Sequence, residues 1–114
     1  MTDYELDVRE NPAPGVVLVE VSGELDLTNA ADFEHRLDEA SGGAQGLVLD
    51  LNRVSFIDSA ALHVLFRVVG RVGFDRFGIV LEPSATIVRT LGIVGLDDAA
   101  RIRPTAAELL PGRA

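Results

Sequence analysis

The sequence has no cysteine and no lysine among its 114 residues, and each absence excludes a class of chemistry. Without cysteine, the chain has no disulfide framework, no thiolate metal site and no direct thiol-based redox control. Without lysine, it has no P-loop lysine for phosphates, no kinase-type strand lysine and no amine for a Schiff base. The function must therefore be one that needs none of these groups.

All ten basic residues are arginine, and against 18 acidic residues they leave a formal net charge of −8. Nucleic-acid binding usually needs a clustered positive surface, so this acidity argues against a nucleic-acid partner. The sequence contains no N-terminal apolar h-region and no run of about 18 apolar residues, so we expect no membrane partner and a cytoplasmic location. With 47% hydrophobic residues, we expect residues 1–114 to form a single compact domain.

Hydrophobic periodicity divides the chain into alternating strands and helices. Period-two or continuous apolar runs predict strands at residues 4–10, 16–25, 46–51, 77–81 and 101–103. Helical spacing predicts helices at residues 27–40, 85–93 and 105–110, and one more after the stretch F-I-D-S at 56–59. This order predicts an α/β fold: a mixed, mostly parallel β-sheet with an N-terminal hairpin and covering helices.

Four residues have side chains that suit the start of these helices. Thr28 is the expected N-cap of the helix at 27–40, and Ser84 that of the helix at 85–93. Ser59 is a favoured N-cap for the helix after F-I-D-S, and Asp58 is able to share that duty. Because an N-cap contributes about 1 kcal/mol to stability, capping alone is a sufficient explanation for Ser59.

Ser59 also has to be weighed as a catalytic serine. It lies in D-S-A-A rather than in G-x-S-x-G, so the nucleophile elbow of α/β hydrolases is not indicated. His63, four residues later, is a candidate general base because helical side chains lean towards the N-terminus. The simpler interpretation is a histidine on an exposed helix face, so a small hydrolase is kept only as an alternative.

Three aspartates, Asp26, Asp50 and Asp58, lie at the ends of predicted strands, and carboxylates suit Mg²⁺. No loop carries several acids at metal-ligand spacing, however, and acids scattered over an acidic surface are usually solvated. We therefore expect no metal and no other cofactor.

Two strand-to-helix junctions carry an acidic residue. One is G-E-L-D-L-T-N-A at 23–30, around Asp26, and the other is F-I-D-S-A-A-L at 56–62, around Asp58. Strand ends that face helix starts are where open α/β sheets place their sites. The two junctions form one surface if their strands are neighbours in the sheet.

These two motifs, in this order and about thirty residues apart, resemble the STAS domain, specifically the bacterial anti-sigma-factor antagonists. The resemblance covers essentially the whole chain, including L-V-L-D-L-N-R-V-S-F-I-D before the serine and V-R-T-L-G-I-V-G-L-D after it. It implies a single STAS-like domain that acts by partner switching and is not itself an enzyme.

Members of this family bind an anti-sigma factor that is also a serine kinase, and so free a sigma factor for transcription. The resemblance implies that this kinase phosphorylates Ser59 with its own ATP and that a serine phosphatase removes the phosphate. It also implies a monomer or weak dimer. The surface expected to bind the partner comprises Asp26, Thr28, Asn29, Asp58, Ser59, Ala60, Ala61 and His63.

The chain departs from the family pattern directly after the serine. Family members often have Ser or Thr and then Gly, where this sequence has Ala60 and Ala61. Ala60 removes a second phosphoacceptor, and Ala61 adds a methyl group where glycine permits close backbone approach. The stripe His63, Arg67 and Arg71 is either a contact for an acidic partner or a solvated helix face.

An alternative from another functional class stays open. A STAS module that is not phosphorylated serves as a subunit of a regulatory scaffold or of a transporter complex. For such a protein Ser59 is an N-cap only, so phosphate on Ser59 is the feature that separates the two functions.

Overall fold

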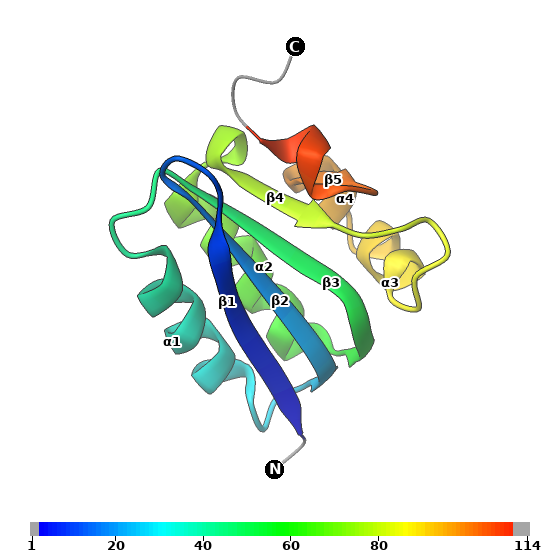
Figure 1. Ribbon diagram of the computed structural model, residues 1–114. Helices are drawn as coiled ribbons and strands as arrows, with labels where there is room; N and C mark the ends of the chain where they lie inside the picture. Colours follow the sequence, from blue (N-terminus) through cyan, green and yellow to red (C-terminus); the bar gives the residue numbers. More distant parts are fainter. Residues whose placement is uncertain (1–2, 111–114) are drawn as a thin grey trace.

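The computed structural model describes residues 3–110, although not the side chains of residues 10–12. Its sheet has five strands in the order β1-β2-β3-β4-β5. The first two form an antiparallel hairpin, and the remaining neighbours are all parallel (Figure 1). The strands are β1 (Tyr4–Ala13), β2 (Val16–Leu25), β3 (Gly46–Ile57), β4 (Phe77–Val80) and β5 (Arg101–Arg103).

Two long helices pack side by side on one face of the sheet (Figure 1). They are α1 (Ala30–Ser41) and α2 (Ser59–Val72). The shorter elements are α3 (Val88–Ile93), α4 (Leu96–Ala99) and the 3₁₀ turns η1 (Phe74–Arg76) and η2 (Ala106–Leu109). No helix within residues 3–110 is long and apolar enough to cross a membrane.

The core lies between the sheet and the helices. Helix-facing side chains alternate along β2 and β3, and Phe33 of α1 and Leu65 of α2 are completely buried against them. The alternation gives core residues Val19, Val21, Leu47, Leu49 and Leu51. A smaller cluster covers part of the opposite face, where η2 packs on the sheet through Val16, Val48, Val80 and Leu109.

The predicted fold class is confirmed, and each predicted strand is present. Strand β3 is longer than expected because the residues after position 51 keep pairing with β2 across two register shifts. The helix expected at 85–93 begins only at Val88, with Ile87 as its N-cap, so the capping role expected for Ser84 is wrong. The final segment is the 3₁₀ turn η2 rather than an α-helix, and α4 was not expected. Such short elements are set by the burial of single residues rather than by periodicity.

The backbone conformation at Gly23 explains why the first junction motif begins with glycine. Its φ angle is +97°, a conformation that side-chain-bearing residues rarely adopt. A Cβ at this position would lie 2.6 Å from the carbonyl oxygen of Asp3, the residue that precedes β1. The motif therefore needs glycine both for its backbone angle and for the close approach of the neighbouring backbone.

We expect Gly23→Ala to lower the free energy of unfolding by about 3 kcal/mol, from backbone strain plus overpacking. Gly43→Ala is the matched control, because Gly43 also has a positive φ but a Cβ added there would meet no atom within 4 Å. That variant should lose only about 1 kcal/mol. Urea unfolding measures both values, and equal losses would show that close approach at Gly23 contributes nothing.

Candidate functional site

The two acidic junctions lie side by side at the carboxyl ends of β2 and β3. These strands are parallel neighbours, and Leu25 at the end of β2 is in register with Ile57 at the end of β3. The backbone amide of Asp58 donates to the carbonyl of Leu25 at 3.1 Å, which continues the pairing one residue beyond β3. The condition set by the sequence, that the two strands be neighbours, is met.

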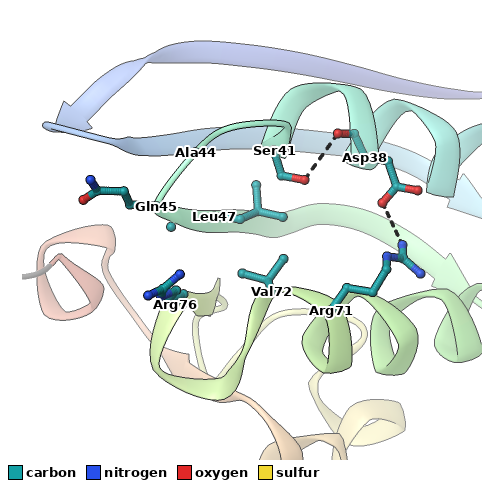
Figure 2. A pocket seen from close by; sticks show the side chains of 9 residues that line it. Asp38, Ser41, Ala44, Gln45, Leu47, Arg71, Val72 and Arg76 are labelled. Atoms are coloured by element: carbon teal, nitrogen blue, oxygen red, sulfur yellow. Dashed lines mark hydrogen bonds and ion pairs between the residues drawn. The ribbon is translucent and has the colours of Figure 1, made fainter.

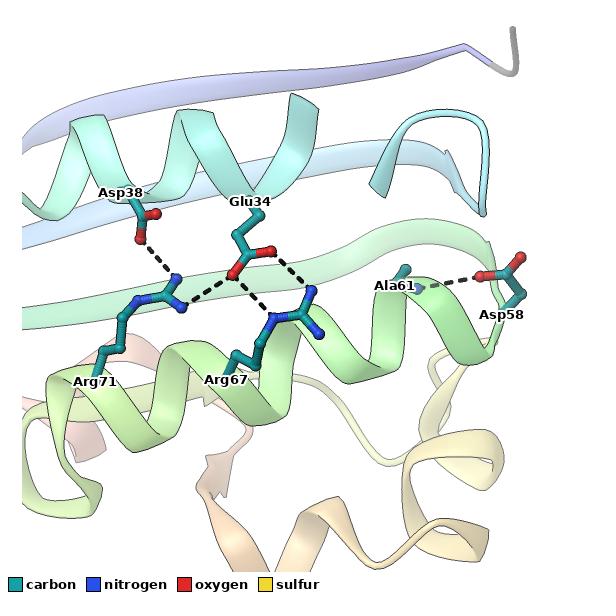
Figure 3. A network of polar contacts seen from close by, with 6 residues as sticks. All are labelled: Glu34, Asp38, Asp58, Ala61, Arg67 and Arg71. Atoms are coloured by element: carbon teal, nitrogen blue, oxygen red, sulfur yellow. Dashed lines mark hydrogen bonds and ion pairs between the residues drawn. The ribbon is translucent and has the colours of Figure 1, made fainter. Parts of the chain in front are cut away.

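Asp58 is the N-cap of α2, and its carboxylate joins the two junctions. Oδ1 accepts a hydrogen bond from the backbone N–H of Ala61 at 3.1 Å, as an N-cap side chain does (Figure 3). Oδ2 accepts from the backbone N–H of Leu27, in the loop between β2 and α1, at 3.0 Å. One carboxylate therefore accepts a hydrogen bond from a backbone N–H at the start of α2 and holds the neighbouring loop through a second one.

Ser59 is the first residue of α2 and not its cap, so the N-cap role expected for Ser59 is wrong. The duty falls on Asp58, whose extended backbone (φ −107°, ψ −177°) lets its side chain reach back to the helix amide. The Ser59 side chain is exposed, and its hydroxyl forms no hydrogen bond with any group of residues 3–110. Because the hydroxyl has no structural duty there, it is available for chemistry.

The first junction is a compact polar turn. Asp26 Oδ1 accepts from both the backbone N–H of Thr28 at 2.9 Å and its hydroxyl at 2.6 Å. Asn29 is 1% exposed; its Oδ1 accepts from the Asp26 amide, and its Nδ2 donates to the carbonyl of Glu24. Helix α1 begins at Ala30 with Asn29 as its N-cap, so the capping role expected for Thr28 is wrong. The Thr28 hydroxyl is turned to Asp26 instead.

The expected partner-contact residues divide by burial. Asp26 and Asp58 are half-buried, whereas Thr28, Ser59 and His63 are exposed. Ala60 is half-buried and packs against the core. Ala61 is 0% exposed and Asn29 is 1% exposed. The core and the loop enclose the side chains of these last two residues, and their part in partner contact stays a prediction.

The structure lends no support to a catalytic or metal-binding arrangement in the described part of the chain. No hydrogen bond joins Ser59 to His63 within residues 3–110. Asp50 lies in the middle of β3, where its Oδ1 accepts from the amide of Asn52, away from the two junctions. Among residues 3–110, no three histidine or acidic side chains gather as a metal ion requires.

The two arginines of the stripe on α2 form ion pairs with acidic residues of α1. They are therefore not unpaired groups for an acidic partner, and they do not contact solvent alone. Arg67 makes two hydrogen bonds to Glu34, at 3.1 and 2.8 Å (Figure 3). Arg71 donates to Glu34 at 2.9 Å and to Asp38 at 2.7 Å. The four residues therefore link the two helices along their exposed edges. His63, the remaining member of the stripe, stays exposed.

These ion pairs perturb Glu34. The hydrogen bonds from Arg67, followed by those from Arg71, lower the pKa of Glu34 from 4.5 to about 2. They outweigh the opposing effect of desolvation on the Glu34 side chain, which is only 21% exposed. The hydrogen bonds to Glu34 raise the pKa of Arg67, and the hydrogen bond to Asp38, followed by that to Glu34, raises the pKa of Arg71. Glu34 is thus ionised over the whole physiological range.

Sequence reasoning missed one feature of this surface, the exposure of Leu27. Its side chain is 78% exposed, although its backbone is held by the Asp58 carboxylate. Phe56, near the end of β3, is 49% exposed. In the sequence, Leu27 is one more apolar residue of G-E-L-D-L, and nothing distinguishes it from the buried residues before it. In the structure β2 ends at Leu25, so Leu27 lies in the loop beyond the strand. Apolar surface therefore lies next to the acidic junctions.

Comparison with known proteins gives a consistent result. The family model of the STAS domain matches residues 6–109. The anti-sigma-F factor antagonist RsfB of Mycobacterium tuberculosis is 33% identical over 100 residues, which are 86% of this chain and 81% of that protein. The crystal structure of an anti-sigma factor antagonist from Mycobacterium paratuberculosis superposes with a TM-score of 0.81 at 29% identity, covering 97% of this chain and 94% of that one.

A more distant structure shares the fold. It is the Bacillus cell fate determinant SpoIIAA in its phosphorylated form, with a TM-score of 0.63 at 20% identity. The match covers 91% of this chain and 95% of SpoIIAA. At this identity the similarity establishes the common fold only.

The capping assignment predicts different effects for two neighbouring substitutions. Asp58→Ala removes the acceptor of both the Ala61 and the Leu27 amides, so we expect a loss of about 2 kcal/mol in unfolding free energy. Ser59→Ala removes no hydrogen bond between groups of residues 3–110 and should change stability by less than about 0.5 kcal/mol. Urea denaturation of the two variants tests this. A loss at Ser59→Ala as large as at Asp58→Ala would contradict the assignment.

The depressed pKa of Glu34 predicts a pH dependence of stability. A carboxyl whose pKa is lower in the folded state stabilises it fully above its unfolded value of 4.5, and this stabilisation is lost as the pH falls through about 2. The difference in unfolding free energy between the wild type and Glu34→Gln should therefore shrink from pH ~5 to pH ~2. Glu82→Gln, on an exposed residue after β4 that forms no ion pair with residues 3–110, is the control for the loss of a carboxylate. A flat difference for Glu34→Gln would refute the low pKa.

Proposed function

The chain belongs to the STAS domain family, and we propose that it is an anti-sigma-factor antagonist whose binding to an anti-sigma factor is switched off by phosphorylation of Ser59. The role as an anti-sigma-factor antagonist is supported by identities of 33% to RsfB and 29% to the mycobacterial antagonist of known structure, each over most of both chains. The observation that carries the proposed switch is the exposed hydroxyl of Ser59 at the start of α2, which has no hydrogen-bond partner among residues 3–110.

We assign partner binding to the surface where the two junctions meet. Its accessible residues are Thr28, Ser59 and His63, with Ala60 and the two carboxylates of Asp26 and Asp58 partly accessible. Asn29 and Ala61 support this surface from beneath through their hydrogen bonds. Hydrogen bonds within the first loop and to Asp58 hold the backbone of the surface in place before a partner arrives, which reduces the entropy lost on binding.

A phosphate on Ser59 is compatible with the fold. It adds about −1.5 to −2 charges and three acceptor oxygens at the positive end of the α2 dipole, where a negative charge is favoured by roughly 0.3–1 kcal/mol. The Ser59 hydroxyl donates to no group within residues 3–110, so its esterification breaks no hydrogen bond there. The domain therefore keeps its structure when the phosphate is added.

The same phosphate acts strongly at an interface. Asp58 and Asp26 already place two carboxylates near the junctions, and the phosphate adds to this negative charge. On binding, this negative surface is brought against negative groups of the partner, and like charges brought together across an interface are unfavourable by several kcal/mol. About 4 kcal/mol weakens binding roughly a thousandfold. The switch thus acts by electrostatic release of the partner and needs no refolding of this chain.

The chemistry of phosphorylation belongs to the partner. We propose that the anti-sigma factor is a serine kinase that supplies ATP and phosphorylates Ser59, and that a serine phosphatase reverses the reaction. The absence of lysine from this chain is consistent with that division, because a protein substrate needs only an accessible hydroxyl. Ala60 leaves Ser59 as the single phosphoacceptor at the helix start.

We expect Ser59→Asp to weaken binding to the cognate anti-sigma factor at least about a hundredfold, while Ser59→Ala binds like the wild type. Ser84→Asp is the matched control, since Ser84 is exposed in the loop after β4 and the variant adds the same charge elsewhere. Calorimetric titration of the three variants measures the affinities, and melting curves check that each is folded. Equal affinities of the Ala and Asp variants at position 59 would refute the proposed switch.

Phosphorylation itself is tested with the same proteins. Incubation with candidate anti-sigma kinases of the same genome and ATP should add one phosphate to the peptide 54–67, as seen by mass spectrometry. The Ser59→Ala variant should gain none. A wild-type chain that none of these kinases phosphorylates would instead favour the scaffold or transporter-subunit alternative.

A further inference from the structure

A second concave region lies at the end of the sheet opposite Ser59. Two adjoining pockets open beside the start of β3, with volumes of about 230 and 690 Å³. They share Gln45, Gly46, Leu47 and Arg76 in their walls. Figure 2 shows the smaller pocket between the end of α1 and the end of α2, with Arg76 and Gln45 at one end. The larger volume lies within the range of small-molecule sites, about 300–1,000 Å³.

The floor of the larger pocket is apolar. Val16, Val48 and Leu109 line it, and together with Val80 they form the small cluster on the second face of the sheet. Leu109 of η2 packs over Gly78, where an added Cβ would lie 2.7 Å from one of its methyl groups. The missing side chain at Gly78 thus allows η2 to form one wall of the pocket.

The rim of the larger pocket is charged, and arginine dominates it. Its charged residues are Asp75, Arg76 and Arg101, a balance of one positive charge in a chain whose net charge is −8. The guanidinium of Arg101 is fixed by donating to the carbonyls of Phe74 and Asp75 at 3.2 and 3.1 Å. Its position is therefore set before any ligand arrives.

Arg76 differs from the other arginines around these pockets. In the smaller pocket Arg71 is neutralised by its ion pairs with Glu34 and Asp38. Arg76 is exposed and forms no ion pair or hydrogen bond with any side chain of the described residues, although it lines both pockets. A guanidinium on the rim of an apolar cavity is suited to a carboxylate or phosphate group.

We propose that the larger pocket is a binding site for a small amphipathic anion, with its carboxylate or phosphate on Arg76 and its short hydrocarbon segment over Val16, Val48 and Leu109. Arg101 adds a second positive charge to the rim, so that the two arginines outweigh the single negative charge of Asp75. The positive rim favours a ligand with an anionic head group, and the apolar floor favours a ligand that also has a hydrocarbon segment.

This site is independent of the phosphorylation switch. Strand β3 runs from Gly46, in the wall of the pocket, to Ile57, next to Asp58 and Ser59. At about 3.3 Å per residue, its twelve residues separate the two sites by roughly 35 Å. A ligand in the pocket therefore does not contact Asp58 or Ser59, and substitutions in the pocket leave the Ser59 surface intact.

The test is a titration of the ¹⁵N-labelled chain, followed by NMR, with sodium octanoate and octyl phosphate as the probes. We expect saturable shift changes at the amides of Gly46, Leu47 and Arg101. Inorganic phosphate, which lacks the hydrocarbon segment, and octylammonium, which has the opposite charge, should each bind at least about tenfold more weakly. Arg76→Gln should weaken octanoate binding about tenfold through the loss of a charge-assisted hydrogen bond.

Arg89→Gln is the matched control, because it removes the same charge from an exposed position on α3. It should bind octanoate like the wild type. The proposal is overturned by shift changes that do not saturate or that lie outside the pocket. Equal binding of octanoate and octylammonium, or equal affinity of Arg76→Gln and the wild type, also overturns it. Phosphorylation of Ser59 in the Arg76→Gln variant is expected to be unchanged, so failure of one proposal is distinguishable from failure of the other.

Discussion

The proposed switch surface depends on the two hydrogen bonds that the Asp58 carboxylate accepts. This carboxylate accepts the Ala61 amide at the start of α2 and the Leu27 amide in the adjacent loop, so it ties a helix to a neighbouring strand end. Because Asp58 performs the capping, Ser59 is left with an exposed hydroxyl that has no hydrogen-bond partner in the described part of the chain. Capping by the preceding aspartate keeps the Ala61 amide hydrogen-bonded whether or not Ser59 carries a phosphate.

Charge is distributed to match these roles. The arginines of α2 are paired with acids of α1, which stiffens the two helices against each other and leaves the acidic junctions without nearby compensation from Arg67 or Arg71. An added phosphate therefore meets carboxylates rather than guanidinium groups. At the opposite end of the sheet, Arg76 keeps its charge unpaired within the described residues, and the apolar cluster under η2 lies beside it. The two ends of β3 thus present opposite electrostatic environments.

Much of the fold was predictable because long amphipathic elements carry a clear period. The five strands, α1 and α2 follow from alternation and helical spacing. The adjacency of the two junctions was predicted only on the condition that their strands are neighbours, which the structure meets. Short elements were not predictable. Helix α3 starts late and α4 was missed, because four to six residues carry too little periodicity and their form is set by burying Leu91 and Leu96.

The sequence by itself determined the family, the α/β order and the two motifs, because these depend on residue type and spacing along the chain. It also determined that no lysine or cysteine chemistry is available. Only the tertiary structure decided which residue caps α2, that Ala61 and Asn29 are enclosed, and that Arg67 and Arg71 are paired. Each of these depends on atoms brought together from distant parts of the sequence, and capping, burial and ion pairing are properties of those distances rather than of local pattern.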